Sequence, residues 1–357
     1  MKFRRLASVV IAAAAAAVIP SVFVLAQTAA PAPAKPTQTA KTTKTWTVTK
    51  TPWGDPDLQG VWNDATSTPM QRPAGKGEAV LNEEQADQFA EQLANDLTRD
   101  RRDGGNEVDV NRAYNEHWMD ARRLKITNDR RTSLIVDPPD GRMPPAVPIS
   151  PERQKIRAER AAAAARFNAG MPDVATELSL PIRCIIRTDS PPYLPTIYNN
   201  DFQIFQSPGY VVIAPEMIHS ARIIPLDGRP HIGPTLKQWL GDTRGHFEGN
   251  TLVIETTNFR TDDGTVYQGA NPETYKITER FTRVADDSIN YEFTISDPLT
   301  WTKPWTAVIP WNKIDPKEQM YEYMCHEDNF DIVHLLTGAR AREKNPALNL
   351  TKPQTQR

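Results

Sequence analysis

The feature that most constrains the fold is a series of short β-type segments that begins after Pro181. Each segment is rich in β-branched and aromatic residues, and turn residues such as Ser207-Pro208-Gly209 separate it from the next. No helical period lies between the segments, which argues against a parallel sheet with crossover helices. We therefore predict a mainly β fold, an antiparallel meander closed as a barrel or a sandwich. The predicted strands cover residues 201–206, 210–214, 218–226, 251–257, 275–284, 288–296, 305–309 and 320–325.

Residues 1–26 have the pattern of an export signal. Lys2, Arg4 and Arg5 form a charged start, an apolar run follows over residues 9–24, and small residues precede Gln27. The run is short for a permanent membrane anchor, and it ends in a cleavage pattern. We therefore expect a cleaved signal peptide and a mature protein in the periplasm or outside the cell, without membrane contact after cleavage.

The rest of the chain divides into four parts. Residues 27–50 are mostly Ala, Pro, Thr and Lys, a composition that predicts a disordered linker. Residues 51–180 should hold the first strand, at Leu58-Gln59-Gly60-Val61-Trp62, and a helical and loop insertion. Residues 181–345 form the predicted barrel core, and residues 346–357 a flexible tail.

Two helices are predicted inside the insertion. Asn82 and Gln85 have the spacing of a capping box ahead of an apolar stripe. For the second helix, Ser150 is the expected N-cap, Pro151 occupies the first turn and Gly170 ends the segment. Its apolar positions are mostly Ala, so we expect this helix at the surface or as a lid.

The chain has two cysteines, Cys184 and Cys325, and both lie in segments that read as buried. In an oxidising compartment such a pair is expected to form a disulfide. The alternative, a catalytic thiolate at Cys325 beside His326, suits a reducing compartment better.

Charge limits the class of partner. The net charge is -2, with 42 basic and 44 acidic residues, so there is no basic excess to attract a phosphate backbone. We expect a small-molecule ligand and no nucleic acid, whereas the composition leaves the oligomeric state open.

The first strand, with Gly60-x-Trp62, is similar to the first strand of a lipocalin-like barrel, a resemblance of architecture alone. A longer pattern resembles a family of exported bacterial proteins to which no reaction is assigned. This pattern consists of Gly241-Asp242-x-Arg244-Gly245-x-x-Glu248-Gly249-x-Thr251-Leu252-Val253-x-Glu255-Thr256, followed by Glu279-Arg280-Phe281 and Cys325-His326-Glu327. The resemblance covers about residues 52–343 and implies no reaction, so the chemistry must be argued from the side chains.

Histidines of the β half lie close in sequence to carboxylates or arginines. A histidine beside a carboxylate is the usual acid–base pair near neutral pH. The candidate catalytic residues are His326 and His219 as acid or base, with Glu322, Glu327 and Glu216 as carboxylate partners. The candidate substrate-binding residues are Arg222, Arg244, Arg183, Asp242, His231, His246 and Trp305. The three arginines have an equal alternative role, a salt bridge at the end of the barrel with Asp227 or Asp242.

No cofactor is expected. The strongest metal alternative would use Glu216, His219 and His326 to hold a divalent ion, but ligands at a fixed helical spacing are missing. A Gly-x-Ser-x-Gly elbow and a phosphate-binding glycine loop are also missing, which argues against serine hydrolases and nucleotide enzymes.

Two functions remain open. The first is an enzyme that performs cofactor-free acid–base chemistry, as a lyase, isomerase or hydrolase, on a small polar or cyclic molecule in a barrel cavity. The second is a non-catalytic binding protein for a small molecule. A histidine within hydrogen-bond reach of a carboxylate inside an open cavity would favour the enzyme.

Overall fold

The computed structural model describes residues 46–74, 78–97, 124–187, 190–218, 220–261, 265–267 and 269–348. The predicted signal peptide, most of the predicted linker, His219 and residues 349–357 lie outside these ranges. The folded unit starts at Trp46. Val48 is buried and the Thr49 carbonyl accepts a hydrogen bond from Asp57 at 2.9 Å, so the fold begins a few residues before the expected boundary at 51.

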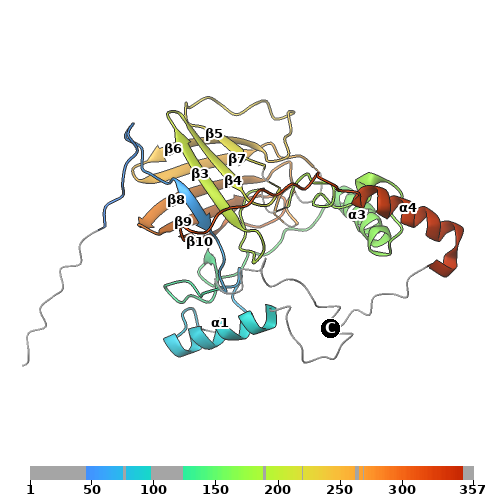
Figure 1. Cartoon of the computed structure of the whole chain (residues 1–357), viewed down its shortest axis with the longest axis horizontal. Helices are drawn as coiled ribbons and strands as arrows, with labels where there is room; N and C mark the ends of the chain where they lie inside the picture. The colour runs from blue at the N-terminus through green and yellow to red at the C-terminus, as the bar shows by residue number, and fades with distance from the viewer. Residues whose placement is uncertain are drawn as a thin grey trace, which may run out of the picture. The chain divides into compact units, whose positions relative to one another are not determined.

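The described residues form a ten-stranded antiparallel sheet that curves into a nearly closed barrel (Figure 1). Its order is β5-β4-β3-β1-β10-β9-β8-β7-β6, and β2 pairs with β10. The mainly β barrel predicted from the sequence is therefore confirmed. The strands are β1 (Gly60–Asn63), β2 (Ile135–Asp137), β3 (Asp201–Ser207), β4 (Tyr210–Pro215), β5 (Arg222–Pro225), β6 (Asp242–Glu248), β7 (Thr251–Thr257), β8 (Lys276–Ala285), β9 (Ser288–Ser296) and β10 (Trp305–Lys313).

The barrel closes between β5 and β6, which lie side by side although no ladder joins them among the described strands. Gly245 of β6 makes this approach possible. A Cβ atom at Gly245 would lie 2.7 Å from Ile224 Cγ2 and 2.9 Å from Leu226 Cδ2. A glycine is therefore required where the two edges meet.

Large side chains fill the interior of the barrel. Along β8, buried residues alternate with half-buried ones, as the pleat of a strand requires. Phe202 of β3 stacks on Trp311 of β10 with ring centroids 4.4 Å apart, and Tyr291 of β9 lies 4.7 Å from Phe281. Trp305, a predicted substrate-binding residue, is fully buried and packs edge-on against Phe293 in this core.

Both predicted helices are confirmed. In α1 (Glu83–Leu97), the backbone N–H of Gln85 donates to Asn82 Oδ1 and the backbone N–H of Asn82 donates to Gln85 Oε1, which completes the capping box. In α3 (Pro151–Asn168), Ser150 Oγ accepts from the backbone N–H of Arg153. The structure also contains α4 (Asp331–Lys344) and the short 3₁₀ turns η3 (Ala175–Glu177) and η4 (Pro346–Leu348).

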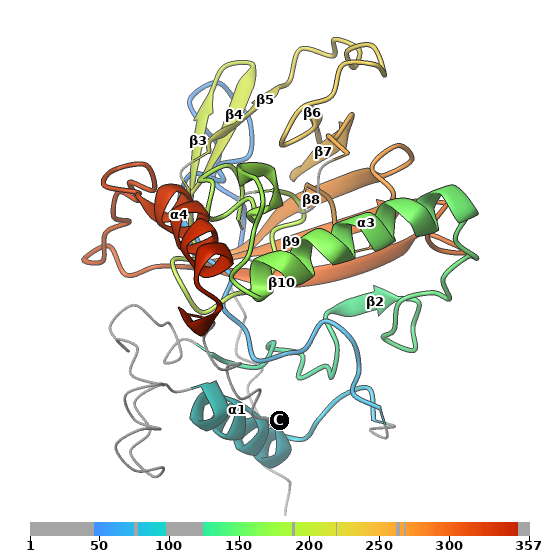
Figure 2. The same cartoon turned by 90° about the vertical axis from the view of Figure 1, so that its right-hand side faces the viewer.

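The helix α4 falls inside the region predicted to be entirely β. Its first residue is the acidic Asp331 and its last turn contains the basic Arg342 and Lys344, a charge pattern that matches the helix dipole. Arg342 donates to the Gly170 carbonyl and Arg340 to the Pro172 carbonyl, so α4 lies beside the end of α3 (Figure 2).

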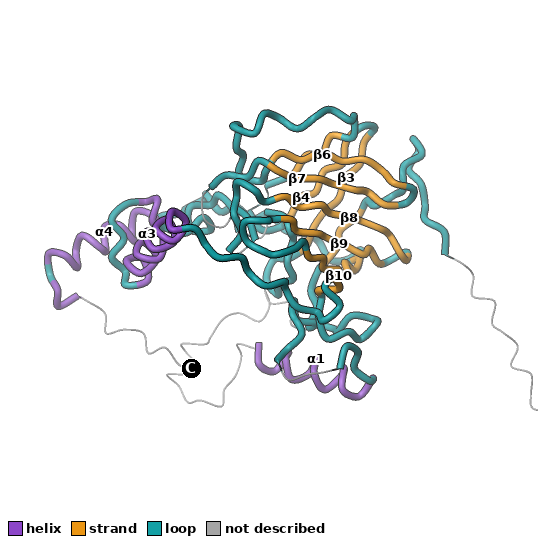
Figure 3. The backbone as a smooth tube through the Cα atoms, turned by 180° about the vertical axis from the view of Figure 1, so that it is seen from behind, coloured by secondary structure: helices purple, strands orange, loops and turns teal. Residues whose placement is uncertain are grey.

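Three strand predictions need correction. Residues 320–325, predicted as the last strand, are a loop of mostly exposed side chains, so this segment buries no apolar face against the sheet. Residues 242–248 were not predicted as a strand but form β6. The strand predicted over 218–226 shortens to β5, since Ile218 has φ +64° and turns the chain before it. Figure 3 shows the helices outside the sheet.

Candidate functional site

The predicted disulfide between Cys184 and Cys325 is present. It joins an irregular segment, residues 181–187, to the loop that follows β10. Asn329 reinforces the link, because its Nδ2 donates to the Ile182 carbonyl at 3.3 Å and contacts Cys184 Sγ at 2.9 Å. The disulfide thereby holds together two segments whose cysteines are 141 residues apart in the chain.

An open groove of about 710 Å³ lies between these two segments. We call it the disulfide groove, and Cys325 forms part of its wall. Four carboxylates line it, those of Glu322, Glu327, Asp328 and Asp331, together with three tyrosines, Tyr198, Tyr321 and Tyr323. Arg187 is the basic residue of the lining, and its guanidinium lies 5.5 Å from the centre of the Tyr198 ring. The groove therefore combines negative charge with aromatic surface.

Three predicted catalytic carboxylates come together around the disulfide groove. Glu322 and Glu327 line it directly. Glu216 lies behind the lining residue Asn199, whose Nδ2 donates to Glu216 Oε1 at 3.1 Å. The Glu216 residue is buried, and its backbone N–H donates to the Asp201 carbonyl at 2.8 Å.

The predicted acid–base histidines do not share this arrangement. His326 is exposed in the turn over residues 325–328, and it is not among the residues that line the groove. His219 lies outside the described residues. Residues 320–325 form a loop where a strand was predicted, so no strand pleat aligns Glu322 with His326.

Arg222, a predicted substrate-binding residue, lies inside the barrel and is buried with Glu279. The guanidinium binds both carboxylate oxygens, and Nη1 also donates to the Tyr193 hydroxyl at 3.1 Å. The Tyr291 hydroxyl donates to Glu279 Oε1 at 2.9 Å. Arg222 therefore contacts a carboxylate of the protein itself where a substrate anion was expected.

Burial and neighbouring charges shift the pKa values of Arg222 and Tyr291. Burial lowers the pKa of the Arg222 guanidinium, but the charge of Glu279, its hydrogen bond and the two neighbouring tyrosines together raise that pKa above its ordinary value. Burial, followed by the negative charge of Glu279, raises the pKa of the Tyr291 hydroxyl well above its ordinary value. The arginine therefore stays charged and the tyrosine stays a neutral hydrogen-bond donor.

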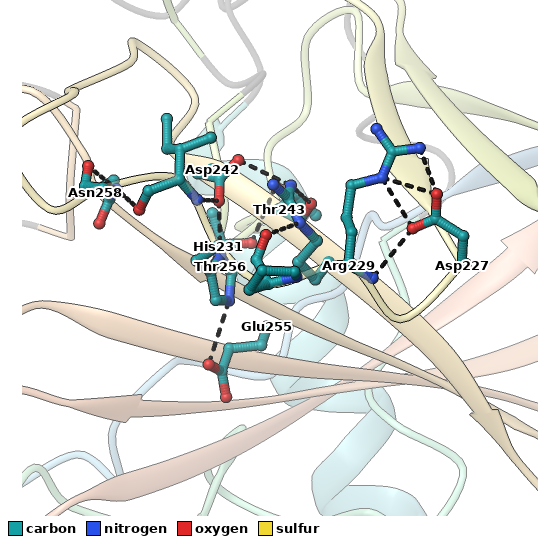
Figure 4. A network of polar contacts seen from close by, with 12 residues as sticks. Asp227, Arg229, His231, Asp242, Thr243, Glu255, Thr256 and Asn258 are labelled. Atoms are coloured by element: carbon teal, nitrogen blue, oxygen red, sulfur yellow. Dashed lines mark hydrogen bonds and ion pairs between the residues drawn. The ribbon is translucent and has the colours of Figure 1, made fainter.

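A second polar network surrounds His231, in the connection from β5 to β6 (Figure 4). His231 Nδ1 lies 2.7 Å from Asp242 Oδ2, and its Nε2 lies 3.2 Å from Glu255 Oε1. Asp242 is almost fully buried, whereas the His231 side chain is 25% exposed. A buried carboxylate thus orients the imidazole, but Glu255 faces the nitrogen that a general base would turn toward a substrate.

Two further contacts hold this network rigid. Arg244 Nη1 donates to Asp242 Oδ1 at 2.8 Å, and its Nε donates to the Pro230 carbonyl at 3.0 Å. Lys276 forms an ion pair with Glu255, the carboxylate that faces His231 Nε2. Both imidazole nitrogens of His231 therefore face carboxylates of the protein.

The remaining predicted residues lie elsewhere. His246 is exposed on β6, where its Nε2 lies 3.1 Å from Glu248 Oε1. Hydrogen bonds from Arg280 and then from His246 lower the pKa of Glu248 below its ordinary value. Arg183 is half-buried in the turn that carries Cys184.

The aromatic lining of the groove was missed at the sequence level. Its signal was the alternation Tyr321-Glu322-Tyr323 just before Cys325, which places acids and rings beside the predicted disulfide. Arg187 and Tyr198 gave no such signal, because only the fold brings their segment to this loop.

The described residues lack both a metal-ligand cluster and a membrane-spanning helix. They contain no group of three or more His, Cys, Asp or Glu side chains placed to hold a metal ion. Their helices also include none with the length and apolar character needed to cross a bilayer.

Comparisons with protein-family models, with curated proteins and with solved structures found no match for this chain, so its resemblance to the exported bacterial family stays a prediction.

Proposed function

We propose that the protein is an exported binding protein that holds a small organic cation in the disulfide groove. One observation carries this proposal: among the described residues, four carboxylates and three tyrosines line the groove with a single guanidinium. Its volume of about 710 Å³ lies within the usual range for ligand sites.

The chemistry of the lining favours a positive charge. A cation gains Coulomb energy from Glu322 and Glu327 and also from the electron-rich faces of the rings. Tyr321 is 64% exposed and Met324 is 50% exposed, so the groove offers apolar surface for the body of the ligand. An anion would meet the same carboxylates and be repelled.

Calorimetric titration tests this proposal, with spermidine and choline as cationic probes and glucose and glutamate as neutral and anionic controls. Glu322→Gln and Glu327→Gln should each weaken cation binding by about two- to fivefold, since an exposed ion pair contributes up to about 1 kcal/mol. Glu91→Gln, which removes one exposed charge from α1, is the matched control and should change nothing. Affinity should also fall as salt rises from about 0.05 M to about 0.5 M.

The proposal fails if neither cation binds, or if both groove variants bind as tightly as the control. Equal affinity for glucose and choline would also contradict it, because the carboxylates would then have no role in recognition.

A cofactor-free acid–base enzyme is the second candidate, supported by the short contact between His231 and Asp242. Its weakness is that Glu255 faces the nitrogen that would have to reach a substrate. Incubation with a metabolite mixture, followed by mass spectrometry, separates the two functions. Consumption of a compound that falls by about 10²–10⁴ in His231→Gln or His326→Gln would favour the enzyme over the binding protein.

A further inference from the structure

A second hollow, distinct from the disulfide groove, lies between α3 and the end of the barrel. It has a volume of about 670 Å³. One wall comes from the first turns of α3, and the other comes from residues of the β7–β8 connection and from Leu299. We propose that this hollow binds a small amphiphilic monoanion, a carboxylate attached to an apolar body. This inference does not depend on the function proposed for the disulfide groove.

Two arginines on α3 line the hollow and have backbone carbonyls as hydrogen-bond acceptors. Arg153 donates to the carbonyls of Ala270 at 3.2 Å and Leu299 at 3.3 Å, and Arg157 donates to the Gly269 carbonyl at 2.8 Å. Neither forms an ion pair with any carboxylate among the described residues.

Other arginines of this protein do form ion pairs with carboxylates. Arg166 pairs with Glu177, Arg229 pairs with Asp227, and Arg280 pairs with Glu248. Carbonyl partners fix the positions of Arg153 and Arg157 without cancelling their charges. A guanidinium held in this way keeps donors and a full charge for an anionic group.

The positive charges also lie close enough to affect one another. The pKa of Arg153 is lowered, first by burial and then by the positive charge of Arg157, while Asp297 and Glu273 act in the opposite direction. A bound carboxylate would relieve this repulsion, so the geometry favours occupation by an anion.

The apolar part of the hollow defines the body of the ligand. Ile156 is 40% exposed and Leu299 is 48% exposed, and both line the hollow with Val266 and Tyr267. Burial raises the pKa of the Tyr267 hydroxyl, which therefore stays neutral. An apolar chain or ring placed here would cover exposed hydrophobic surface while its carboxylate meets the guanidinium groups.

The balance of charge in the lining argues for a single negative charge on the ligand. Arg153, Arg157 and Arg160 contribute positive charges, whereas Glu152 and Glu273 contribute negative ones. A ligand with two or three negative charges would meet these glutamates, so a monoanion fits better than phosphate.

The test is calorimetric titration of the purified protein with octanoate, compared with neutral 1-octanol and with inorganic phosphate. Octanoate should bind more tightly than either comparator. Arg157→Gln should weaken octanoate by about tenfold, because it removes a charge-assisted hydrogen bond. Lys155→Gln is the matched control, since Lys155 lies on the same helix, is exposed and does not line the hollow.

Arg157 also anchors α3, so the fold of each variant must be followed by thermal unfolding. Arg157→Lys keeps the positive charge and should retain more affinity than Arg157→Gln at equal folded fraction. The proposal is overturned if octanoate does not bind, if 1-octanol binds equally well, if phosphate binds as tightly as octanoate, or if Lys155→Gln weakens binding as much as Arg157→Gln. Failure here would leave the cation titration of the disulfide groove unaffected.

Discussion

Asp64 is the residue whose environment departs most from that of an ordinary surface carboxylate. It is fully buried, and its Oδ1 accepts a hydrogen bond from Asn200 Nδ2 at 2.7 Å. Its Oδ2 and the Asn200 Oδ1 have no hydrogen-bond partner among the described residues. Protonation of Asp64 would turn its Oδ2 from a hydrogen-bond acceptor into a donor. Burial raises the pKa of Asp64 well above its ordinary value, and the charge of Asp201 adds to this rise.

This pKa shift predicts a dependence of stability on pH. A carboxyl whose folded pKa is raised stabilises the fold fully below the unfolded pKa, about 3.9, and that stability is lost as pH rises toward the folded pKa. In this window the unfolding free energy should fall by up to about 1.4 kcal/mol per pH unit. Asp64→Asn cannot ionise and should remove that fall. Urea unfolding at pH 5 and pH 8 measures how much the unfolding free energy of each protein falls with pH. An equal fall in the wild type and in Asp64→Asn would contradict a neutral Asp64.

At the scale of elements, the contact between β5 and β6 decides whether the sheet closes. Gly245→Ala would place a methyl group 2.7 Å from Ile224 Cγ2, so the two strands must move apart or repack. We expect a loss of about 1–3 kcal/mol in the free energy of unfolding. Gly233→Ala is the matched control, because a Cβ there meets no atom within 4 Å. Guanidinium unfolding compares them, and equal stabilities would show that the strands can separate without cost.

At the scale of the whole molecule, the disulfide ties the loop after β10 to the irregular segment between β2 and β3. We expect it to stabilise the protein by about 4–5 kcal/mol on the chain-entropy account, because it closes a long loop. The barrel core does not include either cysteine, so the sheet should survive reduction while the groove loses its fixed walls. Far-ultraviolet circular dichroism, which reports the sheet, should therefore change little upon reduction, whereas cation binding should be lost.

The same link allows two checks. Protein made with export and then denatured should have no titratable thiol. The double variant Cys184→Ser with Cys325→Ser controls for side effects of the reductant, since its binding should already be lost and should not respond to reduction. Unchanged affinity in the reduced protein would mean that the groove does not depend on the disulfide.

The sequence by itself determined the features that depend on neighbouring residues. The alternation of apolar side chains predicted most strands, and turn residues placed the β3–β4 hairpin correctly. Asn82 with Gln85, and Ser150 with Pro151, predicted two helix starts because capping uses side chains within one turn. The cysteine pair predicted the disulfide because the chain has no other partner for either thiol.

Only the tertiary structure decided which polar side chains meet. Arg222 was predicted to bind a ligand, but desolvation inside the barrel demands a counter-charge, and Glu279, 57 residues away, supplies it. The loop over residues 320–325 resembled a strand locally, but this segment buries no apolar face against the sheet. The groove, its tyrosines and the carbonyl contacts of Arg153 and Arg157 likewise depend on segments brought together from distant parts of the chain. Local patterns specify elements, whereas burial and partner choice arise only when those elements pack.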